Sequence, residues 1–370
     1  IHPVRMGIDD DPRRAISPSF TTLGEHFLDA GWSTAGVTAN PNANDVFGFA
    51  QGFQQYKGTE NLFNQGVVIR PGVDVMDDFI DMIEDVEGPV YGQVVLLDAH
   101  APWSKNYKNQ LKNLHIPSKR RRDMYDASLR DLDAALEHLD QRLAEIGRGN
   151  RLLVMVGDHG QGLRPPRWAG TGHGTTLYDA HVHVPWVLHG PGVAPNHELG
   201  GVAQQLDLVP TLTSLAGLNI TTELMGLDLS DEVGGSADRV PEGAAVLSAS
   251  RARKADELRL TTDEWVLLKV RGEHRRRRDV KHELFALDDT RQANDLTEEH
   301  PDVLRRMLLN AELAWRAEDR IKEVVPRQPQ RRAERDAQGP RLHGRGGRGR
   351  RQRRGRVGRH VRRGRALAPP

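Results

Sequence analysis

Four side chains have types and spacings that could do chemistry. Asp158 and His159 are adjacent and lie between two glycines, His173 lies between another pair of glycines, and His100 follows an apolar run. A carboxylate oxygen and an imidazole nitrogen are both ligands that divalent cations accept. An imidazole can also act as a general acid near neutral pH, or stabilise anionic oxygens when it is cationic. The Asp158–His159 pair is therefore a plausible half of a metal site.

Short apolar runs precede these residues and predict the strands that position them. Leu152–Val156 leads into the Asp158–His159 turn, and Val94–Leu97 leads towards His100. An apolar run of this length, bounded by turn residues, predicts a buried strand of a parallel sheet. Sites in open α/β sheets form beyond the carboxyl ends of the strands. We therefore expect the four side chains there, where the flanking glycines let a ligand approach closely.

The rest of the first 240 residues alternates between helical and strand patterns. Leucines at helical spacing predict a long amphipathic helix over Arg122–Ile146. Further expected elements are helices at 22–30, 73–84 and 206–216, and strands at 34–39 and 184–188. This alternation predicts an α/β fold.

From about Ala245 the pattern changes to short strands and turns. We expect strands at 246–248, 258–261, 265–270 and 284–287, followed by a helix over Pro301–Ala317. This order predicts a small antiparallel C-terminal subdomain. Arg275–Arg278 would lie in a hairpin loop, where a solvated turn is favoured over a contact to an anionic substrate.

The motifs, taken in order, resemble the sulfatase family of the alkaline-phosphatase superfamily. That family has an apolar strand, then Ser/Gly-Asp-His/Asn-Gly, then a Lys or His ahead of Leu-Tyr-Asp/Glu, then Val-Pro and Gly-Pro-Gly. The corresponding residues are Gly157–Gly160, His173, Leu177–Asp179, Val184–Pro185 and Gly190–Gly192. The resemblance extends to Leu206–Leu212 and to Asn294–Leu296, and it covers about residues 1 to 315.

The resemblance implies an alkaline-phosphatase-like sandwich, in which a central, mostly parallel sheet lies between helices. It implies a sulfatase-like α/β domain over 1–240 and a small C-terminal α+β subdomain over 241–320. Residues 321–370 are rich in Arg and Gly with few large apolar side chains, so a disordered tail is expected there.

The resemblance also gives roles to the four side chains. Asp158 and His159 correspond to metal ligands; the ion is usually Ca²⁺, and an imidazole ligand leaves Mg²⁺, Mn²⁺ or Zn²⁺ open. His173 corresponds to the Lys or His that contacts the sulfate. His100 corresponds to the His that contacts the sulfate or protonates the leaving group. Asp98 could orient His100 through a hydrogen bond.

Two further histidines lie close by in the sequence. His181 and His183 are two residues apart, and in a strand they would share one face. A second metal site is conceivable there, but packing and surface roles are favoured.

The beginning of the sequence departs from the family pattern. The family opens with an apolar strand that ends in two metal-binding aspartates, followed by Cys/Ser-x-Pro-x-Arg, whose Cys or Ser becomes the formylglycine nucleophile. This chain has no cysteine, no apolar strand leads into Asp9–Asp11, and Ser17-Pro18 lacks the required spacing and arginine. The first domain is therefore expected to be truncated at its N-terminus, with the formylglycine in the missing segment.

The leading hypothesis is a sulfuric ester hydrolase that acts on a small-molecule or carbohydrate sulfate ester. It would use a divalent metal and, in an intact version, formylglycine, whereas this chain alone is expected to be inactive. Two alternatives stay open. One is a phosphoryl-transfer member of the superfamily, such as a phosphodiesterase or phosphoethanolamine transferase, and the other is a non-catalytic pseudoenzyme.

Composition excludes several other classes. Residues 321–370 hold 17 Lys+Arg and 3 Asp+Glu out of 52 and 51 in the chain, which leaves the first 320 residues acidic. Nucleic acid binding is therefore not expected, apart from an arm at Arg345–Arg365. No apolar run approaches the ~18 residues of a membrane span. The lack of cysteine excludes disulfides and, with no signal peptide, favours the cytoplasm. The oligomeric state stays open.

Overall fold

The computed structural model describes most of the first 324 residues. The described ranges are 15–59, 70–101, 118–163, 172–174, 176–221, 224–252, 255–272 and 280–324. They belong to one compact unit, residues 1–326. The predictions for Asp9–Asp11, Arg275–Arg278 and the 321–370 tail beyond residue 324 lie outside the described residues, and the proposed boundary at 240/241 stays a prediction.

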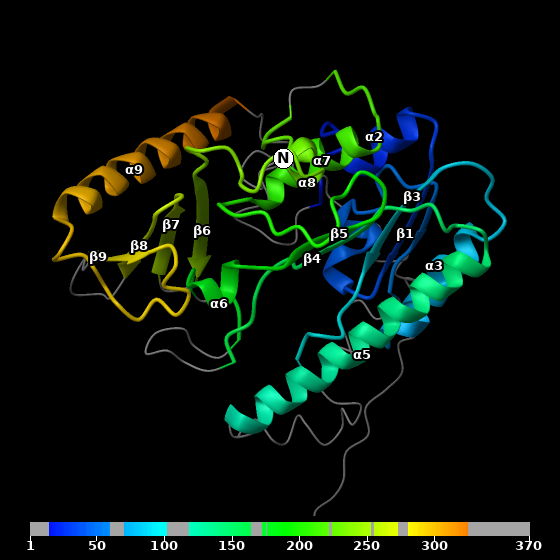
Figure 1. The fold of residues 1–370 in the computed structure, drawn as a ribbon, viewed down its shortest axis with the longest axis horizontal. Helices are drawn as coiled ribbons and strands as arrows, with labels where there is room; N and C mark the ends of the chain where they lie inside the picture. Colours follow the sequence, from blue (N-terminus) through cyan, green and yellow to red (C-terminus); the bar gives the residue numbers. More distant parts are fainter. Residues whose placement is uncertain are drawn as a thin grey trace, which may run out of the picture. The chain divides into compact units, whose positions relative to one another are not determined.

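A three-stranded parallel sheet forms the first layer of the fold (Figure 1). Its central strand is β1 (Ser33–Thr38), which pairs with β2 (Gln55–Lys57) on one side and with β3 (Val90–Val95) on the other. Helix α2 (Leu23–Asp29) precedes β1, and α3 (Gly72–Ile83) precedes β3. This order confirms the predicted alternation of helix and parallel strand.

Helix α2 begins where its sequence predicts. Thr22 is the N-cap residue: its hydroxyl accepts a hydrogen bond from the Glu25 N–H, and the Glu25 carboxylate accepts one from the Thr22 N–H. This reciprocal capping satisfies two backbone donors that a helix start otherwise leaves without partners.

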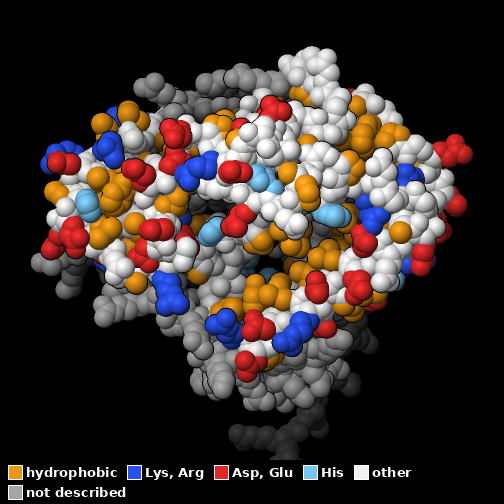
Figure 2. Space-filling model, in the orientation of Figure 1, with side chains coloured by type: hydrophobic (Ala, Val, Ile, Leu, Met, Phe, Trp, Pro, Cys, Tyr) orange, Lys and Arg blue, Asp and Glu red, His pale blue; other side chains and the backbone are white. Residues whose placement is uncertain are grey.

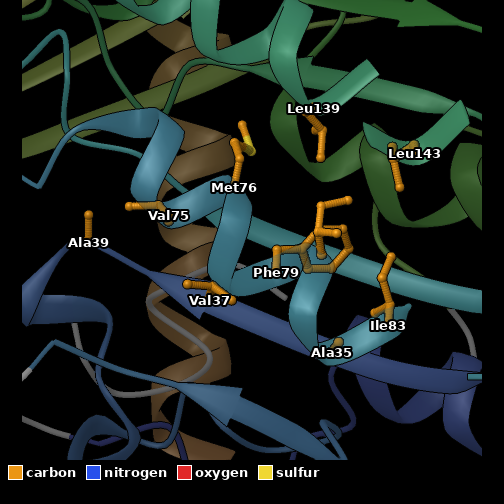
Figure 3. Packing of buried hydrophobic residues seen from close by; sticks show 10 residues of the cluster. Ala35, Val37, Ala39, Val75, Met76, Phe79, Ile83, Leu139 and Leu143 are labelled. Atoms are coloured by element: carbon orange, nitrogen blue, oxygen red, sulfur yellow. The ribbon is translucent and has the colours of Figure 1, made fainter. Parts of the chain in front are cut away.

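The main core lies between the parallel sheet and two helices. Helix α5 (Ser118–Glu145) packs against α3, and side chains of both helices point towards β1 (Figure 3). The buried cluster consists of Ala35, Val37, Ala39, Val75, Met76, Phe79, Ile80, Ile83, Leu139 and Leu143. The part of the predicted α5 stripe around Leu139 and Leu143 therefore belongs to this core, whereas Leu129 of the same stripe is exposed.

Strands β4 (Leu153–Val156) and β5 (Trp186–His189) differ from their prediction. They pair with each other in antiparallel register, with Met155 opposite Val187, rather than as members of a parallel ladder. Met155 is 37% exposed and Val187 50% exposed, so the apolar run does not indicate full burial here. The pairing of β4 was wrongly predicted because an apolar run specifies a strand but not the direction of its neighbour.

Four antiparallel strands form the C-terminal sheet. They follow the order β6 (Val246–Ala252), β7 (Ala255–Thr261), β8 (Trp265–Gly272) and β9 (Val280–Ala286). Helix α9 (Pro301–Val324) covers one face, where Leu260, Leu267 and Leu284 pack on Met307 and Ala311 (Figure 1). The predicted antiparallel subdomain is confirmed, although every strand is longer than its apolar pattern.

Short helices complete the described chain. They are α6 (Asp179–Val182), α7 (Leu208–Leu215), α8 (Ser230–Val233) and the 3-10 turns Pro41–Ala43, Asp45–Phe47 and Gln205–Asp207. Among the described residues, no helix is both long enough and apolar enough to cross a bilayer.

Candidate active site

Three histidines from distant parts of the sequence lie together at one site. The ring centroids of His159 and His173 are 4.2 Å apart and the rings stack, while those of His100 and His173 are 5.5 Å apart. Figure 2 shows histidine side chains around a hollow on one face of the molecule, with hydrophobic side chains beside them. The three imidazoles proposed from the sequence are thus brought together, whereas their roles stay predictions.

A sharp turn after β4 presents Asp158 and His159. The Asp158 carboxylate accepts a hydrogen bond from the His159 N–H at 2.8 Å, and the His159 Nδ1 lies 2.9 Å from the Gly160 carbonyl oxygen. The Asp158 side chain is 79% exposed and its Oδ2 lies 3.7 Å from the His159 Nε2. One oxygen and one nitrogen are therefore both accessible from the same side of the turn.

Other segments hold this turn in place. The Gly160 N–H donates to the His181 carbonyl at 2.8 Å. The side-chain amide of Gln205 donates to the carbonyl oxygens of Gly157 and Asp158, at 2.7 and 3.1 Å. Gln205 was not proposed from the sequence, because its contacts lie 47 and 48 residues away and follow no local pattern.

A bridge between two glycines returns the chain to the site. Gly162 and Gly172 exchange two backbone hydrogen bonds, at 2.8 and 3.1 Å, which places His173 beside the turn. The His173 Nδ1 lies 3.0 Å from the Gln161 Oε1, and the tautomer with the proton on Nδ1 makes this contact a hydrogen bond and leaves Nε2 for a ligand. Gln161 lies inside the core motif, but its residue type gave no signal of this role.

The environment of His173 disfavours its charged form. Partial burial of the ring lowers its pKa below the ordinary value, and the neighbouring His159 and His100 lower it further, while Asp158 opposes them. A cationic His173, as expected from the sequence, therefore needs an anion close to Nε2 to compensate.

His100 follows β3 on a turn of its own. Its N–H donates to the Leu97 carbonyl at 2.8 Å, and its Nδ1 bonds the Ala101 carbonyl. Strand β3 begins and ends earlier than predicted, at Val90 and Val95, because the β1 ladder ends there and Leu96 and Leu97 pack on the core instead. His100 therefore lies on a loop rather than directly at the strand end.

Among the described residues, Asp98 forms no hydrogen bond with His100. Its Oδ1 accepts a hydrogen bond from the Gly72 N–H at 2.9 Å, at the start of α3. Burial raises the pKa of this carboxyl group. Asp98 thus connects the β3 end to a helix start.

His181 and His183 lie on a short helix, not on a strand. His181 in α6 is buried at 3% exposure, while His183 follows the helix and is exposed, so the two do not share a face. The His181 Nδ1 lies 3.0 Å from the Thr176 carbonyl oxygen, and its buried Nε2 has no hydrogen-bond partner among the described residues. The expected packing role fits His181, and no group of three potential metal ligands occurs in the described part of the chain.

This buried imidazole makes the protein sensitive to acid. Burial lowers the pKa of His181, although its hydrogen bond to Thr176 acts in the opposite direction. The unfolded chain therefore binds the proton more readily, so the free energy of unfolding is highest above about pH 6.5 and falls as the pH drops, by up to ~1.4 kcal/mol per unit.

Replacing His181 with Asn keeps a donor near the Nδ1 position and removes the titration. We expect the stability difference between the wild type and His181→Asn to shrink from pH 7.5 to pH 5, measured by urea unfolding. The matched control is His183→Asn at the exposed position. A stability difference that stays constant with pH would contradict this assignment.

Comparison with known proteins decides the family. The sulfatase family model matches residues 7–218, which is more than half of the chain. The chain belongs to the sulfatase family. The recognition made from the Gly-Asp-His-Gly and Gly-His-Gly…Leu-Tyr-Asp motifs is therefore confirmed.

Sulfatase relatives match over limited parts of their length. Arylsulfatase K from Bos taurus is 27% identical over 134 residues, which is 36% of this chain and 24% of that protein. The chain thus spans about a quarter of this relative.

Solved structures extend the similarity to the whole fold. A protein solved with its substrate D-glucosamine-2-N,6-O-disulfate aligns with a TM-score of 0.67 at 12% identity, covering 86% of this chain and 88% of that one. A 2-O glycosaminoglycan sulfatase aligns with a TM-score of 0.66 at 14% identity, covering 88% and 81%. These matches confirm the predicted alkaline-phosphatase-like α/β fold.

Proposed function

We propose that this sulfatase site acts on sulfuric esters, and that its substrate is a sulfated carbohydrate. The observation that carries the proposal is the convergence of His100 and His173 on the Asp158–His159 turn in a chain of this family. The carbohydrate class is supported by the two similar solved structures, one bound to a sulfated glucosamine and one a glycosaminoglycan sulfatase.

Asp158 and His159 fit two positions of a divalent metal site. Their Oδ2 and Nε2 are 3.7 Å apart, a separation that lets both reach one ion, and the Asp158 carboxylate is largely exposed. The described residues supply no third ligand near them. We therefore propose the pair as part of a shell, with Ca²⁺ as the first candidate, completed by ligands outside the described residues. Such an ion would stabilise negative charge on the transferring group.

His173 is proposed to contact the anionic oxygens of the ester. Its Nδ1–H is held by Gln161, so the ring orientation is set before a ligand arrives. A sulfate group near Nε2 would favour the imidazolium and create a charge-assisted hydrogen bond. The positive charge would then appear only when the anion is bound.

His100 is proposed to protonate the leaving oxygen. Its Nδ1 is occupied by the Ala101 carbonyl, which leaves Nε2 for proton transfer. The ring lies beside His173, so a single ester could contact both imidazoles.

The nucleophile is the part of the site that these residues do not supply. The 370 residues contain no cysteine and no Ser in the Cys/Ser-x-Pro-x-Arg pattern. We propose that the chain, purified as these 370 residues, binds a sulfate monoester but does not hydrolyse it.

Binding and turnover can be measured separately to test this. With Ca²⁺ present, we expect glucosamine 6-sulfate to bind in calorimetry and desulfated glucosamine not to bind. His173→Ala should weaken binding by about tenfold or more, because a charge-assisted hydrogen bond contributes about 1.5–3 kcal/mol. His189→Ala, an exposed histidine at the end of β5, is the matched control.

Two results would overturn parts of the proposal. Tighter binding of a phosphate diester than of the sulfate ester would favour the phosphoryl-transfer alternative. Turnover of an aryl sulfate above background, lost in His173→Ala, would show that the chain contains a nucleophile of its own.

A further inference from the structure

The C-terminal sheet holds the segment that joins His173 to helix α6. This segment, Leu177–Asp179, makes hydrogen bonds to the sheet and to the loop after it through each of its three residues. Glu257 and Arg259, the two residues of β7 involved, were not singled out from the sequence. They lie 80 and 82 residues from Leu177, which explains why.

Strand β7 binds both polar groups of the Leu177 backbone. The Leu177 N–H donates to the Glu257 carboxylate at 2.8 Å, and the Leu177 carbonyl accepts from the Arg259 guanidinium at 3.1 Å. Glu257 and Arg259 are two residues apart, so both side chains project from the same face of the strand. The same guanidinium forms an ion pair with Asp179 at 2.5 Å.

Neighbouring residues complete the contact. The Tyr178 hydroxyl donates to the Glu283 carboxylate on β9, and the Asp179 N–H donates to the Gln292 side chain at 2.8 Å. The side chains of Leu177 and Tyr178 also pack on Val266, Leu268 and Phe285.

Burial limits how much the Arg259–Asp179 ion pair can contribute to the stability of the fold. Arg259 is 5% exposed, and the side chain of Asp179 is 11% exposed. A buried ion pair often contributes no more stability than apolar side chains of similar volume, because both charges lose their hydration. Its distinctive property is directional geometry. Arg259 Nη1 contacts both the Asp179 carboxylate and the Leu177 carbonyl, while Nε donates to the Thr261 hydroxyl at 2.8 Å and so fixes the plane of the guanidinium.

Both ends of the Leu177–Asp179 segment that Arg259 contacts lead to residues of the site. His173 lies a few residues before Leu177, and α6 begins at Asp179. The His181 carbonyl on α6 accepts the Gly160 N–H, which belongs to the Asp158–His159 turn. Movement of Leu177–Asp179 would therefore displace His173 and the turn together.

We propose that Arg259 is a positioning residue for the site, which aligns His173 with the Asp158–His159 turn through its contacts with Leu177 and Asp179. That this site binds a sulfate ester rests on the proposed function. The role of Arg259 in holding the two histidine rings together does not depend on any substrate. It extends the functional unit to a sheet that contributes no side chain to the site itself.

The test measures ring geometry rather than activity. In the full chain labelled at histidine, we expect nuclear Overhauser contacts between the rings of His159 and His173. Arg259→Lys keeps the positive charge but loses the planar fork, so we expect it to fold and to show weakened contacts. Arg259→Met alone leaves the buried Asp179 carboxylate without its partner, whereas the double variant Asp179→Asn/Arg259→Met removes both buried charges. We therefore expect the double variant to unfold at a higher temperature than Arg259→Met. The ring contacts between His159 and His173 should be lost in both.

A matched control uses the other face of the sheet. Lys269 forms an ion pair with Glu312 of α9 at 3.5 Å, so Lys269→Met/Glu312→Gln also removes an ion pair of this sheet. The ring contacts should be unchanged in this control. Wild-type ring contacts in every Arg259 variant that folds would overturn the proposal.

Ligand binding separates this proposal from the proposed function. Loss of ring contacts together with at least a tenfold loss of glucosamine 6-sulfate binding supports both. Loss of ring contacts in a chain whose wild type never binds the ester supports the positioning role and contradicts the proposed function.

Discussion

Replacing Gly160 with alanine is expected to destabilise the fold and to displace the candidate metal turn. A Cβ at this position would lie 2.3 Å from the Ala180 carbonyl oxygen and 3.1 Å from the His181 Cα, both of them backbone atoms. Backbone cannot move aside as a flexible side chain can, so the turn and α6 must separate. The Gly160 N–H to His181 hydrogen bond would be lost with the contact. We expect a loss of about 3 kcal/mol, at the upper end for overpacking.

Urea unfolding measures this effect, and another glycine of the same chain gives the control. Gly149 has open space around the position of its Cβ, so Gly149→Ala should change stability by no more than about 0.5 kcal/mol. Gly160→Ala should also weaken sulfate ester binding by tenfold or more, because His159 moves with the turn. Equal unfolding midpoints for the two variants would show that the turn and α6 are not in close contact.

Replacing Ile80 with alanine is expected to remove about 2–5 kcal/mol of stability. Ile80 is 0% exposed and lies in the cluster between the parallel sheet, α3 and α5. The deletion removes buried methyl groups and leaves a cavity that rigid neighbours fill only in part. Because β3 belongs to this layer and the loop after it contains His100, the loss affects the part of the molecule that positions the site.

The control for Ile80 is an apolar residue of another helix. Leu309 on α9 is 59% exposed, so Leu309→Ala should cost less than about 0.5 kcal/mol in the same urea experiment. A similar midpoint shift in both variants would show that the cluster around Ile80 is not the main core.

Elements with strong local signals could be predicted from the sequence. The helix expected over 22–30 is α2, and apolar residues at helical spacing predicted α3 and α5 to within a few residues. These features depend on neighbours along the chain, so the sequence contains the relevant information locally.

Elements fixed by distant partners could not be predicted in the same way. The apolar density at Val94–Leu97 suggested a strand, but pairing with β1 moved β3 to Val90–Val95. Likewise, the alternation in His181–His183 suggested a strand, whereas the chain forms α6, whose end is held by the His181–Gly160 contact. In both places a tertiary contact overrides the local pattern.

The residues of the candidate site also differ in whether local sequence could identify them. The histidines at 100, 159 and 173 could be proposed because each follows a strand or lies between glycines. Gln205 and Arg259 could not, since nothing near them in the sequence shows which carbonyl oxygens they bind. Their contacts became visible only when the fold brought segments 48 and 82 residues apart together.

The two faces of strand β7 differ in chemistry. Alternate residues of β7 point either to Leu177–Asp179, as Glu257 and Arg259 do, or to α9, as Leu260 does. A single-residue insertion in this strand would exchange the two sets, because side chains alternate along a strand. It would bury charge beneath α9 and offer leucines to the backbone of Leu177. Length changes in this sheet should therefore be tolerated at its hairpin turns and not within β7, although no residue of β7 lies in the site.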